Sequence, residues 1–349
     1  PDIDLDLAYG SYEVGVQTIT LADASGGERN LTVDVWYPLG DLADTAPALH
    51  QYTLVPGTYY ESPFALDVGP ESIAPDGPFP LVIYSHGSGG IRYIHSNYTE
   101  ALASNGYIVA APDHTGNTAA DRLLGTEVDG AVTAINRPND VQRVIDAFLD
   151  PESTETVGYV ASVNPDQIAV TGHSFGGFTA YAMASGFTNE KGDLVADERV
   201  DAIIPLAPAA GPNLLTDELL ASIEIPALVM VGTDDKTTPV DPNVTRPWEL
   251  TASAPHYRVD LTAAEHETFT DLCAYQAFLP TLPDALPAVI DTINERTEAG
   301  CAPDDMPIER AQAITNTFAV AFLDEVFRGG EMVQLDEVDE QTDLTFQAK

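Results

Sequence analysis

One serine of this chain stands in a sequence context that favours nucleophilic chemistry. Ser174 is the third residue of the run G-H-S-F-G-G over 172–177, which follows the apolar stretch 167–171 (QIAVT) and opens a stretch, 175–185, typical of a helix. Glycines around a serine permit the tight strand-to-helix turn that lifts its hydroxyl above a sheet. The alternative interpretation is an ordinary glycine-rich turn. We expect Ser174 to act as a nucleophile.

A serine hydroxyl becomes nucleophilic when a neighbouring base removes its proton, and that base needs an acid to orient it. Of the seven histidines, His266 alone follows both the last predicted strand and a pair of acid candidates. His173 is expected to point away beneath the sheet, His86 belongs to a glycine loop, and His256 lies at the wrong end of its strand. We therefore expect His266 to be the base, with a surface histidine as the alternative.

The acid is expected at the end of a strand between the serine and the base. The apolar stretch 227–231 (ALVMV) runs into 232–240 (GTDDKTTPV), which offers two neighbouring carboxylates, Asp234 and Asp235. Either carboxylate would hold His266 in the tautomer that accepts a proton. The other would cap the turn or support its neighbour.

A second glycine-rich loop is suited to stabilising an oxyanion. The apolar run 79–85 (FPLVIYS) ends in His86-Gly87-Ser88-Gly89-Gly90. We expect the backbone N–H groups of Ser88 and Phe175 to be the two donors, with Gly87 and Gly89 allowing close approach and His86 shaping the loop. Losing one such donor costs about 3–4 kcal/mol of barrier. The alternative is a flexible glycine loop; acyl transfer of this kind needs no metal and no cofactor.

The elements that must position these residues alternate along the chain. From residue 79 the predicted strands are 79–85, 107–112, 167–171, 202–206, 227–231 and 257–261, and the predicted helices are 93–104, 139–149, 175–185 and 308–327. This alternation predicts an α/β fold with a mostly parallel central sheet and helices on both faces. Sites in such folds form at the carboxyl ends of the strands, where the candidate residues fall.

The N-terminal residues 1–78 show a different sequence pattern. Two stretches, 12–20 and 31–37, show β-type alternation and flank a hairpin-like break at 23–30. Residues 40–78 are rich in Pro, Gly and Asp and are expected to form a long surface connection. We expect one domain over 1–349.

Residues 276–304 are expected to form a small lid-like insertion. Its apolar residues are Phe278, Leu279, Leu282, Leu286, Val289 and Ile290. They would form either a lid that admits long acyl chains or a surface that packs on the terminal helix, and we favour packing.

Composition narrows the class of protein. The chain has 349 residues, with 55 Asp and Glu against 14 Lys and Arg, which gives a net charge of −41. Such a charge repels nucleic-acid backbones and anionic membrane surfaces, so neither is expected as a main partner. No apolar run approaches the ~18 residues of a membrane span. We interpret the acidity as adaptation to salt, against the alternative of acidity merely tolerated.

Two cysteines, Cys273 and Cys301, lie in one Pro-rich segment. They predict a disulfide if the protein is exported, with two unpaired thiols as the alternative. The chain begins at Pro1, which fits a processed or trimmed form. A secreted or periplasmic location is favoured, and the cytoplasm of a salt-accumulating cell is the alternative.

At these motifs the sequence resembles the α/β-hydrolase superfamily, and within it bacterial proteins similar to platelet-activating-factor acetylhydrolases and dienelactone hydrolases. The resemblance covers 79–330. It is carried by PLVIYSHGSGG (80–90), LASNGYIVAAPDHTGNT (102–118), RPNDVQRVIDAFL (137–149), VTGHSFGG (170–177), GTDDKTTPV (232–240) and HETFTD (266–271). The resemblance implies an α/β-hydrolase fold with the order Ser174, Asp235, His266, and favours Asp235 over Asp234 because Asp-x-x-x-Pro-Val is usual in related hydrolases.

Three departures bear on the substrate. Ala207 stands where animal acetylhydrolases carry the acid, so the acid has moved to Asp235, as in polyester hydrolases and cutinases. Dienelactone hydrolases use a cysteine where this chain has Ser174. Cutinase-like polyester hydrolases carry a Trp in the segment that here reads 207–210 (APAA).

The predicted triad and the resemblance together imply a serine carboxylesterase for a small-molecule or polymeric ester. Short to medium acyl esters are favoured, because the sequence shows no long apolar lid. The alternatives with the same triad are a polyester (PET-like) depolymerase, a lipid acetylhydrolase and an amidase. A non-catalytic binding module is the remote alternative.

Overall fold

A computed structural model describes residues 9–23, 26–27, 29–42, 46–55, 57–281, 287–298, 300–333 and 343–349. Its centre is a mixed sheet of eleven strands in the order β13-β12-β11-β10-β7-β5-β6-β2-β1-β4-β3. The strands are β1 (Val14–Leu21), β2 (Leu31–Pro38), β3 (Leu49–Val55), β4 (Thr58–Leu66), β5 (Phe79–Ser85), β6 (Ile108–Pro112), β7 (Val163–His173), β10 (Ala202–Leu206), β11 (Ala227–Gly232), β12 (His256–Leu261) and β13 (Leu344–Ala348). β8 (Phe187–Asn189) and β9 (Gly192–Leu194) form a separate hairpin.

The six central strands, from β12 to β6, run parallel to one another. β13 and β2 pair antiparallel with the two ends of this set, β1 pairs antiparallel with β2, and β4 pairs parallel with β1 and antiparallel with β3. The helices are α1 (Ser96–Ser104), α2 (Ala119–Leu124), α3 (Gly130–Leu149), α4 (Val157–Val160), α5 (Phe175–Ser185), α6 (Asp217–Ala221), α7 (Val240–Asn243), α8 (Thr245–Leu250), α9 (Leu272–Phe278), α10 (Pro287–Thr297) and α11 (Ile308–Arg328), with short 3₁₀ turns η2 (Pro70–Ser72), η3 (His266–Phe269) and η4 (Leu279–Thr281). The predicted α/β fold with a mostly parallel sheet is confirmed. No described helix is long and apolar enough to cross a membrane.

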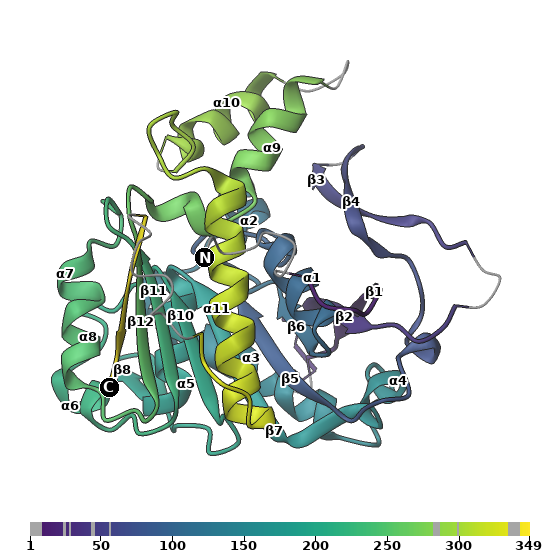
Figure 1. Ribbon diagram of the computed structural model, residues 1–349, viewed down its shortest axis with the longest axis horizontal. Coiled ribbons are helices and arrows are strands. Elements are labelled where there is room, and N and C mark those ends of the chain that lie inside the picture. The colour runs from purple at the N-terminus through teal and green to yellow at the C-terminus, as the bar shows by residue number, and fades with distance from the viewer. Residues whose placement is uncertain are drawn as a thin grey trace.

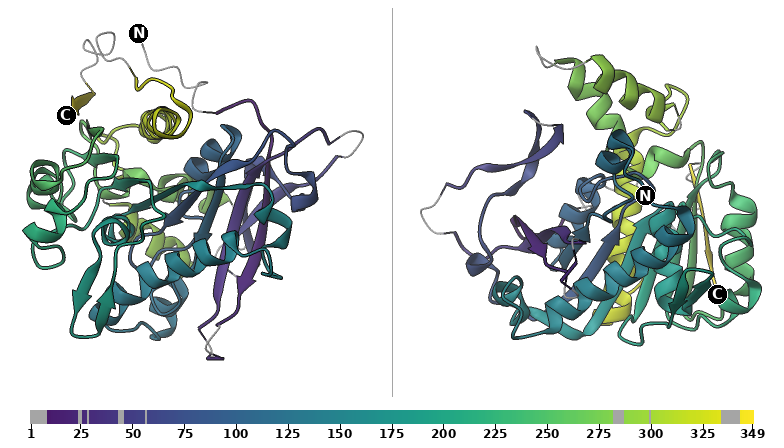
Figure 2. Two further views of the ribbon diagram at one scale, coloured as in Figure 1. Left: turned by 90° about the horizontal axis from the view of Figure 1, so that it is seen from below. Right: turned by 180° about the vertical axis from the view of Figure 1, so that it is seen from behind.

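Helices cover both faces of the sheet. The central strands are therefore buried on both faces and carry apolar residues on both. Figure 1 shows α11 crossing one face, and the view from behind in Figure 2 shows α3 on the other. Alternate residues of β5 enter the two cores. Val82 and Tyr84 pack with residues of α1 and α11, whereas Leu81 and Ile83 pack with residues of α3 and α5.

Residues 40–78 are not a plain surface connection, and that expectation is wrong. They contain β3 and β4, a hairpin at the edge of the sheet. Tyr52 anchors the hairpin, because its ring is buried and its hydroxyl bonds the Trp36 indole N–H (2.8 Å) and the Glu100 carboxylate (2.7 Å). Proline and glycine around short strands concealed the pattern, since both residues usually mark turns.

Two further boundaries differ from the expectation. Helix α3 begins at Gly130 rather than Asn139, because Pro138 lies inside the helix instead of starting it. The side-chain amide of Asn139 donates to the carbonyl of Ile135 next to the proline. The last strand of the sheet is β13, not β12; Phe346 of this added edge strand stacks on Tyr257.

The loops that carry the candidate site residues follow the carboxyl ends of the parallel strands and meet at this edge of the sheet. Above this edge rise the β3–β4 hairpin and the helices α9 and α10 (Figures 1 and 2). Phe278 of α9 packs against Tyr60 of β4, and Leu279 is buried. Of the apolar positions expected in 276–304, Leu282, Leu286 and the Val289 side chain lie outside the described residues.

Candidate active site

Ser174 occupies a sharp turn between the end of β7 and the start of α5. Its backbone has φ 57° and ψ −116°, a conformation that costs free energy for a residue with a side chain. The turn is held by the Ser174 N–H, which donates to the carbonyl of Leu206, and by the Ser174 carbonyl, which accepts from the N–H groups of Gly177 and Ala209. The predicted strand–turn–helix arrangement is therefore present.

The flanking glycines are required by close packing. A Cβ atom on Gly176 would lie 1.8 Å from the carbonyl oxygen of Ser85, and one on Gly172 would lie 2.5 Å from the same atom. The turn thus sits directly against the end of β5. Any larger residue at Gly176 would push the nucleophile away from the loop that follows β5.

His266 lies within hydrogen-bond distance of both the serine and an acid. Its Nε2 is 2.9 Å from Ser174 Oγ, and its Nδ1 is 2.7 Å from Asp235 Oδ2. His266 and Asp235 are almost fully buried. A proton on Nδ1 is held by the carboxylate, which leaves the Nε2 lone pair facing the serine hydroxyl.

Asp235 is the acid in contact with His266, whereas Asp234 is exposed and bonds the Thr233 hydroxyl (3.1 Å). Asp235 Oδ1 accepts from the N–H groups of Thr237 and Thr238 at 2.8 and 2.7 Å. Burial opposes ionisation of Asp235, but hydrogen bonds from His266 and Thr238 outweigh it and lower the pKa of this carboxyl below its usual value. The carboxylate is therefore charged and fixed in one orientation.

Thr238, which the sequence did not single out, completes this arrangement. Its hydroxyl lies 2.8 Å from Asp235 Oδ2, 3.1 Å from His266 Nδ1 and 2.9 Å from the carbonyl oxygen of Ala207. Ala207 stands at the end of β10 with φ 41°. Thr238 therefore links Asp235 to the end of β10, which is the position of the acid in the acetylhydrolases that the sequence resembles.

His173 does not point away from the site, and that expectation is wrong. Its ring lies 4.5 Å from the ring of His266, and its Nε2 is 3.0 Å from the carbonyl oxygen of His266. As the alternation along a strand predicts, the His173 side chain lies on the face of β7 opposite α5. That face is covered by η3, which contributes Phe269. Burial and the neighbouring His266 hold the pKa of His173 well below its usual value, so His173 is a neutral donor that fixes the His266 backbone.

The loop after β5 lies beside Ser174 and is held from beneath by Arg137. The Arg137 side chain is fully buried, and its guanidinium donates to the carbonyl oxygens of His86 and Gly87 and to the side-chain oxygen of Asn117. Burial lowers the pKa of Arg137 to about 9. Sequence reasoning missed this role, since an arginine inside a helical stretch carries no local signal of its tertiary partners.

His86 shapes the same loop, as expected. Its Nε2 accepts from the N–H of His114, which leaves Nδ1–H to donate to the carbonyl of Gly87 at 2.7 Å. Ser88, proposed with Phe175 as an oxyanion donor, lines the pocket and accepts the Asn117 amide at its hydroxyl.

A cavity of about 310 Å³ opens above the serine, lined by Ser88, His173, Ser174 and His266 and also by Arg122, Glu267 and Arg296. It adjoins a cleft of about 380 Å³ between the β3–β4 hairpin and the α9–α10 pair, with Leu54, Ile91, Tyr275, Leu279 and Ile293 in its walls. The two share Ile94, Leu272 and both arginines. Among the residues that the structure describes, no three His, Cys, Asp or Glu side chains are grouped to hold a metal ion.

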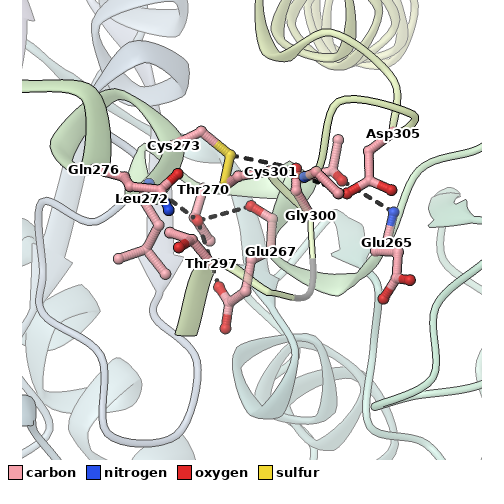
Figure 3. Close-up of a disulfide and its surroundings, with 12 residues drawn as sticks. Glu265, Glu267, Thr270, Leu272, Cys273, Gln276, Thr297, Gly300, Cys301 and Asp305 are labelled. Carbon is pink, nitrogen blue, oxygen red and sulfur yellow. Dashed lines mark hydrogen bonds between the residues drawn. A yellow bond between two sulfur atoms is a disulfide. The ribbon is translucent and has the colours of Figure 1, made fainter. Parts of the chain in front are cut away.

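The predicted disulfide between Cys273 and Cys301 is present. Figure 3 shows it beside Glu267 and Thr270, on the segment that follows His266. The bond joins α9 to the segment before α11 and so encloses α10 in a covalent loop.

Three kinds of known protein are similar to this chain. The family model "Platelet-activating factor acetylhydrolase, isoform II" matches residues 4–131, and the model "Chlorophyllase" matches residues 68–233. A solved ferulic acid esterase from Streptomyces cinnamoneus superposes with a TM-score of 0.70 at 25% identity, covering 96% of both chains. The chain has an α/β-hydrolase fold. It is related to platelet-activating factor acetylhydrolase, chlorophyllase and ferulic acid esterase.

Curated relatives match a smaller part of this chain. Chlorophyllase type 0 of Chenopodium album is 29% identical over 40% of this chain and 37% of its own length. Platelet-activating factor acetylhydrolase of Cavia porcellus is 28% identical over 31% of this chain and 32% of its own length. The match thus spans about a third of each relative.

Proposed function

We propose that the protein is a serine carboxylic-ester hydrolase that acts through an acyl-enzyme on esters of short to medium acyl chains. The observation that carries this proposal is the continuous hydrogen-bonded path from Ser174 Oγ through the His266 ring to Asp235 Oδ2. It lies at the mouth of a cavity, at the carboxyl edge of the sheet.

In the first half of the reaction Ser174 Oγ attacks the ester carbonyl while His266 Nε2 takes the serine proton. Asp235 stabilises the imidazolium that forms, and the N–H groups of Ser88 and Phe175 are the proposed donors to the oxyanion. His266 then gives its proton to the departing alcohol. In the second half the same ring removes a proton from water, which releases the acid and restores the serine.

The size of the cavity favours a short or medium acyl group beside the serine, and the adjoining apolar cleft offers room for another part of the substrate. Polyester hydrolysis and lipid deacetylation use the same triad and remain alternatives. The disulfide supports an oxidising location outside the cytoplasm, because such bonds persist there.

Hydrolysis of p-nitrophenyl esters from acetate to palmitate, by the wild type and by Ser174→Ala, tests this function. We expect activity greatest at short to medium chains and abolished in the variant. Ser222→Ala, an exposed position at the end of α6, is the matched control and retains activity. Equal activity of the wild type and Ser174→Ala would rule out the serine mechanism, and inactivity of both on every ester would favour a binding module.

A further inference from the structure

Two arginines stand in the wall of the cavity above the proposed nucleophile, although the chain carries few basic residues. Arg122 of α2 and Arg296 of α10 line both the catalytic cavity and the adjoining cleft. The protein has 14 Lys and Arg among 349 residues and a net charge of −41. Two of the few basic residues therefore lie together in one cavity wall of a strongly acidic protein.

Arg296 is also exceptional among the arginines in its lack of a partner. Apart from Arg137, which is bonded to carbonyl oxygens, every other arginine in the described ranges forms an ion pair with an Asp or Glu. The half-buried guanidinium of Arg296 has neither an ion pair nor a hydrogen bond to any residue that the structure describes. A half-buried cation without a partner is costly, and a bound anion would offset that cost.

Arg122 adds a second positive charge next to the oxyanion loop. A Cβ atom on Gly89 would lie 2.5 Å from the guanidinium carbon of Arg122, so this side chain rests on the residue that follows Ser88. Its partner Glu127 is at the surface, where an ion pair is weak (Nε–Oε1 3.1 Å).

One acid in the cavity wall, Glu267, interacts with Arg296 through its charge but forms no ion pair with it. Glu267, which follows His266, lines the same cavity, and burial raises the pKa of its carboxyl. None of the described residues that line the adjoining cleft is acidic. Apart from the two arginines, the described residues that the cavity and the cleft share are Gly90, Ile94 and Leu272, none of which is acidic.

We infer that the site selects esters that carry a free carboxylate, held by Arg296 and Arg122, with an apolar portion of the same molecule in the adjoining cleft. A planar guanidinium matches a carboxylate in a bidentate geometry. This inference rests on the proposed esterase function. It assigns to α10 a part in substrate selection, within the segment 276–304.

Two pairs of esters, each with an anionic and a neutral member, test the inference at fixed ionic strength. Mono-p-nitrophenyl glutarate against p-nitrophenyl pentanoate places the carboxylate in the acyl half. Meta-acetoxybenzoate against meta-acetoxybenzamide places it in the alcohol half. We expect kcat/KM to favour the anionic member of at least one pair by about tenfold, as charge-assisted hydrogen bonds allow.

The variants separate recognition from chemistry. Arg296→Gln is expected to lower kcat/KM for the anionic ester far more than for its neutral partner and so to remove most of this preference, and Arg296→Lys to restore part of it. Lys191→Gln makes the same change in net charge at an exposed position in the β8–β9 turn and should keep the preference. A preference near one in both pairs, or one that Arg296→Gln leaves unchanged, overturns the inference.

A binding measurement distinguishes failure of the inference from failure of the esterase function. Calorimetry with Ser174→Ala should show tighter binding of the preferred anionic ester than of its neutral partner, and the added Arg296→Gln change should abolish the difference. Serine-dependent turnover without this difference contradicts carboxylate selection alone. The difference without any turnover contradicts only the esterase function.

Discussion

Replacing Asp235 with asparagine perturbs the proposed mechanism at one atom. Oδ1 of Asp235 accepts two backbone N–H groups, from Thr237 and Thr238. An asparagine at this position keeps those bonds only if its oxygen faces the two N–H groups. Its NH₂ then occupies the place of Oδ2, 2.7 Å from His266 Nδ1.

That amide is a donor, so the neutral His266 ring must accept at Nδ1 and carry its proton on Nε2. A protonated Nε2 cannot remove the proton of Ser174, although every heavy atom remains in place. The loss expected from this wrong tautomer is about 10⁴-fold in kcat. The KM for a neutral ester should change little, because Asp235 does not line the cavity.

The assay is steady-state hydrolysis of p-nitrophenyl butyrate at neutral pH, with thermal unfolding as the check on folding. Asp234→Asn is the matched control, since it removes the neighbouring charge from an exposed side chain, and it should retain wild-type activity. Asp235→Asn that keeps more than about a tenth of the wild-type kcat would refute the assignment of the acid. Loss of activity in Asp234→Asn alone would transfer the role to Asp234.

Four further predictions concern the surroundings of the site and the fold. Arg137→Lys cannot reach both carbonyl groups of the 86–90 loop, so kcat should fall about tenfold to a hundredfold with KM nearly unchanged, and a larger change in KM than in kcat would argue against a positioning role. Burial raises the pKa of Glu100 to about 7, so the folded state keeps a proton that the unfolded chain releases and loses stability as pH rises from about 4.5 to 7. Glu100→Gln should therefore flatten the unfolding free energy over this window by up to about 3 kcal/mol in denaturant titrations, whereas an unchanged slope would contradict the burial argument. The paired changes Cys273→Ser and Cys301→Ser open a loop with a sequence separation of 28 and should cost about 3–4 kcal/mol of unfolding free energy; a loss under about 1 kcal/mol would indicate a strained or redundant bond. If the acidic surface is an adaptation to salt, the thermal midpoint should rise from dilute buffer to molar NaCl, and no rise would remove that interpretation.

The parallel core of the fold was predictable because its strands are buried on both faces and therefore read as apolar runs. Strand β10 and helix α5 have the predicted bounds. The edges were not predictable in the same way. β3, β4 and β13 mix polar and aromatic residues, and their place depends on distant partners such as Trp36 and Tyr257.

The residues of the candidate site also divide into those that the sequence could place and those that it could not. Ser174, Asp235 and His266 could be placed because each follows a strand whose carboxyl end meets the others at one edge, and the structure brings the three together. Arg137 and Arg296 could not, since helical arginines look alike in sequence whether they face solvent or a cavity. His173 was misplaced because alternation along β7 gives the face of the sheet but not the loop that covers it.

Covalent trapping of the nucleophile tests the central claim most directly. Treatment with a fluorophosphonate, followed by intact mass and peptide mapping, should add one phosphonyl group at Ser174 and abolish ester hydrolysis in proportion to labelling. Ser174→Ala should remain unlabelled. Modification at another residue with loss of activity, or full labelling of Ser174 with activity retained, would contradict the serine mechanism.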